Sequence, residues 1–371
     1  MKLRKVIVVP DSYKGVMSAK QVADIIACEV TSIYPNCVVV KMPIADGGEG
    51  SVETIISAVG GKLYETKVLS PDGRLITASF AIAADGTAIL EMAQSSGLTK
   101  QNGLNPMTAN TYGFGQLILT ALEYGAREFI LCIGGSATTD GGGGMASALG
   151  VQFHDNEGNR FIPCGATLSE IADIDVRGID GRIPESKFTV MCDVENPLFG
   201  ENGAAYVYAP QKGASFEQVL ALDKGLRHLR AILLDRFGAD YSNNPGAGAA
   251  GGLGAGCMAF LNADLVRGSD AILNLCGFED HLPDTDLIIT GEGKLDAQSF
   301  SGKVLSGILS RAGGVQVCSI CGVCECEKYI IDENNIDVFE VSEGISKEES
   351  MENTAKYLRI ATERAMRMYS Q

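Results

Sequence analysis

Short apolar runs alternate with segments of helical periodicity at both ends of the chain. Residues 6–9 form an apolar run of strand length, and the segment after them repeats apolar residues at helical spacing. Ser18 and Gln21 stand at the spacing of a capping box, so this helix is expected to begin there. The order of strand, loop and helix returns at residues 38–60 and at residues 287–313. This alternation predicts an α/β fold with a largely parallel sheet.

The C-terminal part adds a strand and a helix. Residues 315–322 predict a buried strand, and Ser346, with Glu349 three positions later, predicts the start of a final helix. The strand holds the first members of a C-x-x-C-x-x-C-x-C cluster, which consists of Cys318, Cys321, Cys324 and Cys326. This spacing resembles a ligand run for zinc or an iron–sulfur centre. We favour the strand and expect no functional metal, because free Cys in a strand behaves as a small hydrophobe.

The middle of the chain has a different pattern. Residues 76–82 and 88–92 are extended alternating runs, and residues 155–158 have the composition of a hairpin turn. A chain of 371 residues also exceeds one compact core. We therefore predict a parallel-sheet domain made of both chain ends, residues 1–78 and 286–371, and an inserted mixed α/β domain, residues 79–285. A cleft between the domains is the expected ligand site.

Composition and charge narrow the function. Hydrophobic residues make up 46% of the chain and charged residues 20%, which is typical of a globular protein. The formal net charge of −16 argues against nucleic acid and anionic membrane partners. The apolar run near the N-terminus is too short for a signal peptide, and eleven cysteines without such a signal indicate reduced thiols. We expect a cytoplasmic protein, and the sequence leaves a homo-oligomer open.

Acidic and other polar residues follow the predicted strands at their carboxyl ends. Because ligands bind at that edge of open parallel sheets, these residues are candidates for a common function. Carboxylates among glycines suit a magnesium–nucleotide site, in which carboxylates hold the cation and amides or lysines take the phosphates. The sets are Asp11 with Ser12 and Lys14, Asp46 with Glu49, Gly134 to Asp140, Asp193 with Asn196, and Glu292 with Asp296.

The segment after the predicted strand at residues 130–133 has almost no side chains. Glycines let backbone amides approach an anion closely, and the start of the following helix adds partial positive charge, so this loop predicts phosphate binding. No G-x-x-x-x-G-K-[ST] motif occurs, which excludes an ordinary P-loop kinase. The candidate phosphate-binding residues are Gly134, Gly135, Ser136, Thr138, Thr139, Asp140, Gly141 and Gly142.

A second glycine-rich stretch matches G-x-G-x-x-G at Gly246, Gly248 and Gly251. No strand is predicted before it, so close helix packing or a hinge explains it as well as dinucleotide binding does. The three histidines of the chain lie in no nucleophile motif, and carboxylates are therefore the candidate general bases.

Five motifs together resemble the bacterial class I glycerate kinases, and the resemblance runs from end to end of the chain. It implies a two-domain fold with a Rossmann-like part and transfer of phosphate from ATP to D-glycerate, usually at the 2-hydroxyl. The cysteines near Cys318 depart from the family's usual aliphatic segment and leave a redox question open. The motifs are Asp11–Gly15 (DSYKG), Pro43–Gly50 (PIADGGEG), Gly134–Gly142 (GGSATTDGG), Asp193–Leu198 (DVENPL) and Thr290–Asp296 (TGEGKLD).

Roles follow from the residue pattern and the resemblance together. Asp193 is our preferred general base, with Asp296 as the close competitor. Lys14 and Ser12 are expected to contact the substrate carboxylate or the moving phosphoryl group. Further expected substrate contacts are Asp11, Asp46 and Asn196; expected nucleotide contacts are Glu292 and Gly293; and candidate Mg²⁺ ligands are Asp46, Glu49 and Asp296.

Other readings remain open from the sequence. The acceptor could be the 3-hydroxyl of glycerate or another small hydroxy acid. An NAD-dependent hydroxy-acid oxidoreductase would need a strand-linked glycine motif, which the chain lacks. A non-catalytic receptor for a small anion would normally carry an export signal.

Overall fold

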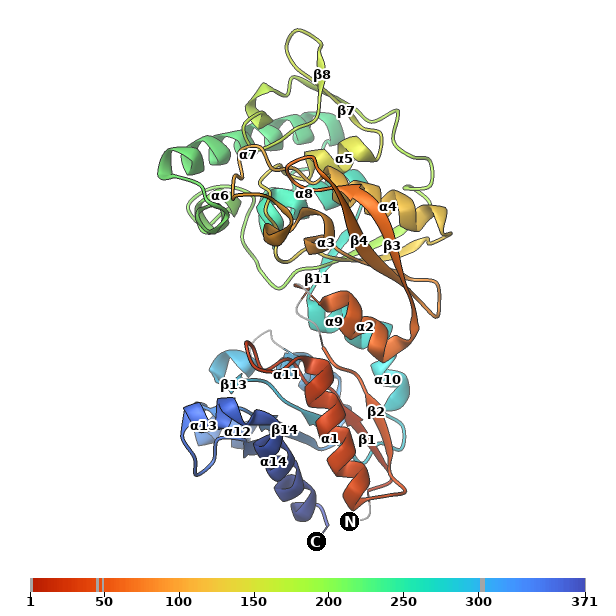
Figure 1. Ribbon diagram of the computed structural model, residues 1–371, viewed down its shortest axis with the longest axis vertical. Coiled ribbons are helices and arrows are strands. Elements are labelled where there is room, and N and C mark those ends of the chain that lie inside the picture. Colours follow the sequence, from red (N-terminus) through yellow and green to blue (C-terminus); the bar gives the residue numbers. More distant parts are fainter. Residues whose placement is uncertain (1–2, 45–46, 49, 301–303, 371) are drawn as a thin grey trace. The chain divides into compact units, whose positions relative to one another are not determined.

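The computed structural model describes residues 3–44, 47–48, 50–300 and 304–370 (Figure 1). The chain divides into two compact units. The first unit comprises Met1–Asp46, Ser57–Val59 and Ser269–Gln371, and the second comprises Gly47–Ile56 and Gly60–Gly268. Both contain helices and sheets, so the predicted α/β class is confirmed as a mixed α/β fold. The boundary expected near residue 79 falls inside a strand of the second unit.

The larger sheet of the first unit has five parallel strands, and β13 (Lys294–Leu295) pairs with β15 (Val323–Cys324) in a separate two-stranded sheet. The register of the larger sheet aligns Val6 with Leu287 and Ile288 with Val317, so the strands end at a common edge. The runs predicted as strands at residues 6–9, 287–290 and 315–322 are confirmed within two residues. In sheet order the strands are β16 (Ile336–Glu340), β14 (Val317–Cys321), β12 (Leu287–Thr290), β1 (Lys5–Val8) and β2 (Val38–Lys41).

Helices α1 (Ala19–Ile33) and α14 (Thr354–Met368) lie side by side in the first unit (Figure 1). Their buried apolar residues share one core with β1, β12 and β14, which explains why the helical periodicity of both segments is strong. The capping box of α1 is confirmed, because Ser18 Oγ accepts a hydrogen bond from the amide of Gln21 and the Gln21 side chain accepts one from the Ser18 amide.

The predicted final helix is two helices. Ser346 caps α13 (Lys347–Glu352), and Glu349 donates its amide to the Ser346 hydroxyl. Asn353 then leaves the helical conformation at φ −122° and ψ 31°, and α14 begins after it. The break follows from an Asn at the junction, since its short polar side chain favours helix ends over helix interiors. The other helices of the unit are α9 (Gly268–Leu275), α10 (Phe278–His281), α11 (Val304–Arg311) and α12 (Lys328–Glu333).

The main sheet of the second unit is mixed. Its four parallel strands pair in register from Glu91 through Cys132 to Met191, and two antiparallel strands extend the sheet at one side. Phe129 and Phe188 stack on neighbouring strands at 4.6 Å between ring centroids and anchor its core. In sheet order the strands are β11 (Asp264–Val266), β10 (Lys187–Met191), β6 (Glu128–Cys132), β5 (Ala88–Glu91), β4 (Leu75–Ala83) and β3 (Gly61–Leu69).

A small antiparallel sheet and several helices complete the second unit. The hairpin turn predicted at residues 155–158 joins β7 (Gln152–His154) to β8 (Arg160–Phe161), and β9 (Asp173–Asp175) pairs on the other side of β7. The helices with most of their length in this unit are α2 (Ser51–Val59), α3 (Ala93–Ser96), α4 (Tyr112–Glu123), α5 (Gly143–Ala148), α6 (Ala204–Tyr208), α7 (Phe216–Phe237) and α8 (Ala249–Leu261).

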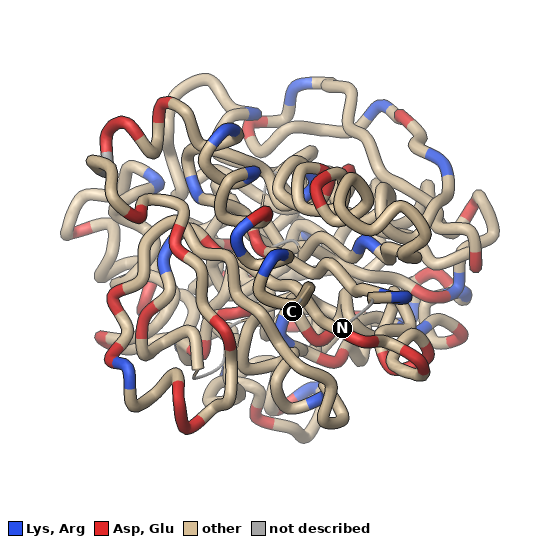
Figure 2. The backbone as a smooth tube through the Cα atoms, turned by 90° about the horizontal axis from the view of Figure 1, so that it is seen from below, with Lys and Arg blue, Asp and Glu red and all other residues tan. Residues whose placement is uncertain are grey.

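Charge and hydropathy of the folded chain agree with its composition. Acidic residues outnumber basic ones by 46 to 30, and Figure 2 shows the two signs interspersed along the backbone. Among the helices that the structure describes, none has both the length and the apolar character needed to cross a membrane.

Candidate functional site

The parallel strands of the second unit end at one edge, and three of the segments that follow them carry polar groups. Glu91 ends β5 and pairs with Cys132 of β6, which in turn pairs with Met191 of β10. The glycine-rich loop follows β6, and Asp193 follows β10 after one residue. The prediction that strand-end residues gather at this edge therefore holds for the second unit.

Neighbouring backbone holds the first half of the glycine-rich loop. Ala137 donates its amide to the Ser96 carbonyl at 3.0 Å, and the Gly134 amide donates to the Gly47 carbonyl at 2.9 Å. A Cβ atom on Gly134 would lie 2.8 Å from that carbonyl oxygen, so only glycine allows this approach. The segment around Gly47 thus packs directly against the loop.

Asp140 is a structural anchor of the second half of the loop. Its carboxylate is fully buried and accepts hydrogen bonds from the Thr111 amide and hydroxyl at 2.7 and 2.8 Å, and from the amides of Gly142 and Gly144 at 3.2 and 3.1 Å. Burial raises the pKa of this carboxyl group, and the four hydrogen bonds oppose that shift.

These bonds correct one expectation about phosphate binding. The amides of Gly142 and Gly144 at the start of α5 donate to Asp140, and the Met145 amide donates to the Thr111 hydroxyl. The start of this helix therefore has its donors occupied by the protein itself, and it does not supply them to a phosphate. The sequence could not show this, because Thr111 lies far from the loop in the chain.

Unpaired donors remain in the middle of the loop. Within the residues that the structure describes, the amides of Gly135, Ser136, Thr138 and Thr139 donate to no protein acceptor. The buried hydroxyls of Thr138 and Thr139 also have no hydrogen-bond partner there. Buried polar groups are normally paired, so this stretch is the part of the loop that a ligand would satisfy.

The second glycine-rich stretch packs on the loop. Ala250, Gly251 and Gly252 have left-handed φ angles inside α8, and Gly251 accepts the Gly141 amide at 3.1 Å. A Cβ atom on Gly251 would lie 2.0 Å from the Thr138 carbonyl oxygen. Residues 241–245 before it form turns, so close packing is the explanation that the structure favours over dinucleotide binding.

Lys212 lies beneath the loop and was not among the predicted site residues. Only 1% of it is exposed, and its ammonium group donates to Ser136 Oγ at 2.8 Å and to the Thr138 carbonyl at 2.6 Å. It belongs to the short 3₁₀ helix Pro210–Lys212, and no local pattern distinguishes it from an exposed lysine.

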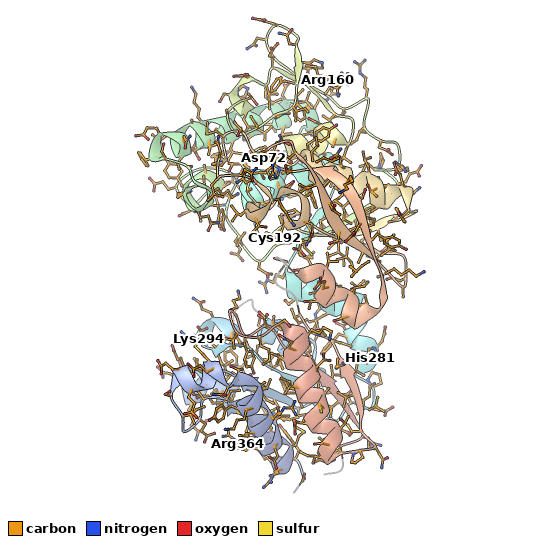
Figure 3. The ribbon with its side chains drawn as sticks, viewed as in Figure 1. Asp72, Arg160, Cys192, His281, Lys294 and Arg364 are labelled. Carbon is orange, nitrogen blue, oxygen red and sulfur yellow. The ribbon has the colours of Figure 1, made fainter. Side chains whose placement is uncertain are left out.

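Asp193 and Asn196 hold backbone near the same edge. Asp193, next to Cys192, which is labelled in Figure 3, accepts the Gly268 amide at 2.8 Å. Asn196 uses both ends of its side-chain amide inside the unit, donating to the Asn202 carbonyl at 2.8 Å and accepting from the Tyr208 hydroxyl.

Glu91 is a second residue that our sequence analysis missed. It is fully buried, and its carboxylate accepts the amides of Gly50 and Val52 at the start of α2. Its position at the end of a predicted strand was an available signal, the same one that selected Asp193.

In the first unit, the motifs that begin at Asp11 and Thr290 lie together. The Asp11 amide donates to the Gly291 carbonyl at 2.8 Å, and the Tyr13 hydroxyl donates to the Ile320 carbonyl at 2.7 Å. A Cβ atom on Gly293 would touch Tyr13 Cα at 3.4 Å. Asp11, Ser12, Lys14, Glu292 and Gly293 thus occupy the carboxyl edge of β1 and β12, as predicted for strand-end residues.

Asp296 lies in a small charged cluster. Its Oδ1 accepts the Gln298 amide at 3.0 Å, and Lys294, labelled in Figure 3, places Nζ 3.7 Å from Asp296 Oδ2 and 2.7 Å from Glu325 Oε2. Asp46 and Glu49, the other predicted Mg²⁺ ligands, lie outside the described residues. In the described ranges, no three His, Cys, Asp or Glu side chains converge as a metal site.

The cysteine cluster begins in a strand, as predicted. Cys318 and Cys321 are buried in β14, whereas Cys324 and Cys326 are half-buried after it. A hydrogen bond from Cys321 lowers the pKa of the Cys324 thiol to about 6. Glu325 in this segment donates its amide to the Leu295 carbonyl, so the cluster borders the strand-end residues of β12.

A mixed α/β fold with a glycine-rich loop and carboxylates after its parallel strands is typical of α/β proteins that bind a small ligand at the carboxyl edge of a sheet. The chain belongs to the glycerate kinase family, whose model matches residues 6–370. This confirms the resemblance found in the five motifs.

Individual relatives cover nearly the whole chain. The chain is 42% identical to glycerate 2-kinase of Escherichia coli K12, over 92% of this chain and 91% of that protein. It is 40% identical to glycerate kinase of Bacillus subtilis 168, over 95% and 94%. A crystal structure from Salmonella typhimurium LT2, provisionally assigned as glycerate kinase 2, superimposes with a TM-score of 0.87 at 34% identity, covering 99% of this chain and 98% of that one.

Proposed function

We propose that this chain is a cytoplasmic glycerate 2-kinase that transfers the γ-phosphoryl group of ATP to the 2-hydroxyl of D-glycerate and requires Mg²⁺. The observation that carries this proposal is the 42% identity to a glycerate 2-kinase over 92% of the chain. We further propose that the two units act as separate domains, the first of them Rossmann-like. The parallel sheet of the first unit supports that assignment.

In the second unit, the loop from Gly134 to Thr139 would hold nucleotide phosphates. Its support is the row of unpaired amides and hydroxyls at the end of β6. Asp140 and the glycines at 141 and 142 would act on the nucleotide indirectly, by fixing the loop, because their polar groups are already bonded. Asp193 is our proposed general base for the attacking hydroxyl.

In the first unit, Lys14 and Ser12 would contact the substrate carboxylate or the transferred group, since they stand beside Asp11 at the edge of β1. Asp296 is our proposed Mg²⁺ ligand in this unit, since a carboxylate oxygen is the ligand type that this cation prefers. Asp46 and Glu49, which lie outside the described residues, are our other candidate ligands. Bound Mg²⁺ would neutralise charge on the nucleotide phosphates. Glu292 and Gly293 would border the nucleotide, and Asn196 would act through the segment from Asn202 to Tyr208 that it holds.

The test is a coupled ATPase assay with D-glycerate, glycolate, lactate and tartronate, followed by phosphorus NMR of the product. We expect ATP consumption only when Mg²⁺ and D-glycerate are both present, and a product phosphorylated at the 2-hydroxyl. Turnover that survives EDTA would contradict the metal requirement. A signal from a 3-phosphorylated product would show that the 3-hydroxyl, and not the 2-hydroxyl, is phosphorylated.

A further inference from the structure

Lys212 is buried without a carboxylate partner. Its ammonium group is bound by one hydroxyl and one carbonyl, Ser136 Oγ and Thr138 O, and two of its three donors are thereby used. Burying a charged group costs several kcal/mol unless opposite charge and hydrogen bonds compensate. Fixing a loop alone would not require a charge, because a neutral donor would serve equally well.

The two acceptors of Lys212 belong to the stretch with unpaired donors. The Ser136 amide and the Thr138 amide donate to nothing in the described part of the chain, and the Thr138 hydroxyl is buried without a partner. The ammonium group of Lys212 therefore lies against the same short segment that carries the unpaired donors, although Lys212 itself comes from a different part of the sequence. All of these groups favour negative charge.

We propose that Lys212 is a positioning residue for the phosphate loop, and that its buried positive charge is completed by an anionic phosphate group of the nucleotide held on Gly135–Thr139. It acts through Ser136 and Thr138, whose hydroxyl and carbonyl it holds. The proposal rests on the proposed function, since it takes ATP or ADP as the ligand. It adds to that function a residue outside all five family motifs and a charge requirement for the loop.

The protonation of Lys212 gives this proposal a specific signature. Burial lowers the pKa of Lys212 to about 7, and Asp140 is the one charged group among the described residues that acts in the opposite direction. A bound phosphate group adds a second negative charge near the ammonium and raises this pKa. At pH 8, where free Lys212 is largely neutral, nucleotide binding should therefore draw a proton from the solvent.

Isothermal titration calorimetry with Mg²⁺ and ADP at pH 8 tests this. Wild type titrated in HEPES and in Tris, whose ionisation enthalpies differ, should show net uptake of roughly one proton per ADP bound. Lys212→Met should bind ADP about 10- to 100-fold more weakly and take up no proton, which corresponds to the loss of one charge-assisted interaction. Lys224→Met, an exposed lysine on α7, is the matched control and should behave like wild type.

A second variant separates charge from hydrogen bonding. Lys212→Gln keeps a donor for Ser136 or Thr138 but has no charge, so it should also bind weakly and without proton uptake. Both variants should unfold at temperatures at or above that of wild type, because the change removes a buried charge. Wild-type affinity in Lys212→Gln would overturn the charge requirement and leave a purely structural lysine.

The outcome is distinguishable from a failure of the proposed function. Wild type that binds no ADP at all would contradict the nucleotide site itself, and the role of Lys212 would fall with it. Wild type that binds ADP and phosphorylates glycerate, with unchanged affinity and proton uptake in Lys212→Met, would overturn the role of Lys212 alone.

Discussion

At the scale of single residues, the carboxylates that follow the parallel strands differ in burial and in the hydrogen bonds that they accept. Asp140 accepts four hydrogen bonds, three from backbone amides and one from the Thr111 hydroxyl, which is the pattern of a structural anchor. Asp193 is exposed and Asp296 is half-buried, and their carboxylates accept the backbone amides of Gly268 and Gln298. Their exposure suits a group that must exchange a proton with a substrate.

Substitution of the two candidate bases separates their roles. Asp193→Asn keeps the size of the side chain and removes its basicity, so we expect kcat to fall by roughly 10²- to 10⁴-fold with little change in ATP affinity. Asp296→Asn should instead raise the Mg²⁺ concentration needed for half-maximal activity, because it removes a charged ligand. Titration of Mg²⁺ at saturating ATP and glycerate measures both effects.

The reverse pattern would reassign the base. Near-normal turnover in Asp193→Asn, together with an inactive Asp296→Asn that still binds ATP, would show that Asp296 accepts the proton of the substrate hydroxyl. Asp193 would then be a strand-end residue that holds the Gly268 amide.

Single site residues could be predicted from the sequence only where a neighbouring pattern, such as an apolar run, pointed to them. Asp11, Asp193 and Glu292 were selected because they follow apolar runs, and the parallel sheets bring them to the expected edges. Lys212 carried no such signal, because its burial depends on packing between segments far apart in the chain. The occupation of the α5 amides was equally hidden, since it requires Thr111.

At the scale of elements, the left-handed break inside α8 is what brings a second glycine-rich segment against the phosphate loop. Gly251 has φ +70° and faces the Thr138 carbonyl, so a side chain there meets both backbone strain and a steric clash. Gly238, after α7, has the same φ of +70° with nothing within 4 Å of its Cβ position. The two glycines therefore form a matched pair.

Alanine at these positions should have different costs. Gly238→Ala should lower the free energy of unfolding by about 1 kcal/mol through backbone strain alone. Gly251→Ala should lower it by about 3 kcal/mol and also weaken ADP binding, because overlap with the Thr138 carbonyl displaces the loop. Scanning calorimetry and titration of ADP measure the two effects. Equal stability of both variants would show that α8 does not constrain the loop.

Elements with strong periodicity were predicted well, and their junctions were not. The strands β1, β12 and β14 and the start of α1 agree with expectation because apolar runs and a capping box define them locally. One final helix was predicted from the start signal at Ser346, and that signal says nothing about the helix interior. The helix is interrupted at Asn353, whose backbone leaves the helical conformation.

At the scale of the whole molecule, the buried lysine makes stability depend on pH. Lys212 has a pKa of about 7 in the folded protein against 10.5 as its ordinary value. Between these values the unfolded chain binds more protons than the folded one, so stability rises with pH. As the pH rises above 7, the free-energy cost of burying Lys212 in wild type therefore decreases. The decrease ends when the lysine of the unfolded chain also loses its proton.

The comparison of wild type with Lys212→Met isolates this contribution from other titrations. The variant should exceed wild type in unfolding temperature most clearly near pH 7, and the difference should narrow as the pH rises to 10. Thermal unfolding followed by circular dichroism at pH 7, 8.5 and 10 measures the trend. A difference independent of pH would mean that Lys212 keeps an ordinary pKa in the folded state.

The interrupted first sheet also imposes an order on biosynthesis. Val9 and Thr290 are joined by a hydrogen bond across 281 positions, so β1 leaves the ribosome long before the neighbour that covers one of its edges has been translated. Every strand of the second unit's main sheet has by then been made, within Gly60–Gly268. We therefore expect the second unit to fold first on the nascent chain, while β1 and β2 still have an unpaired edge. In this interval the unpaired strand edge is open to pairing with another chain.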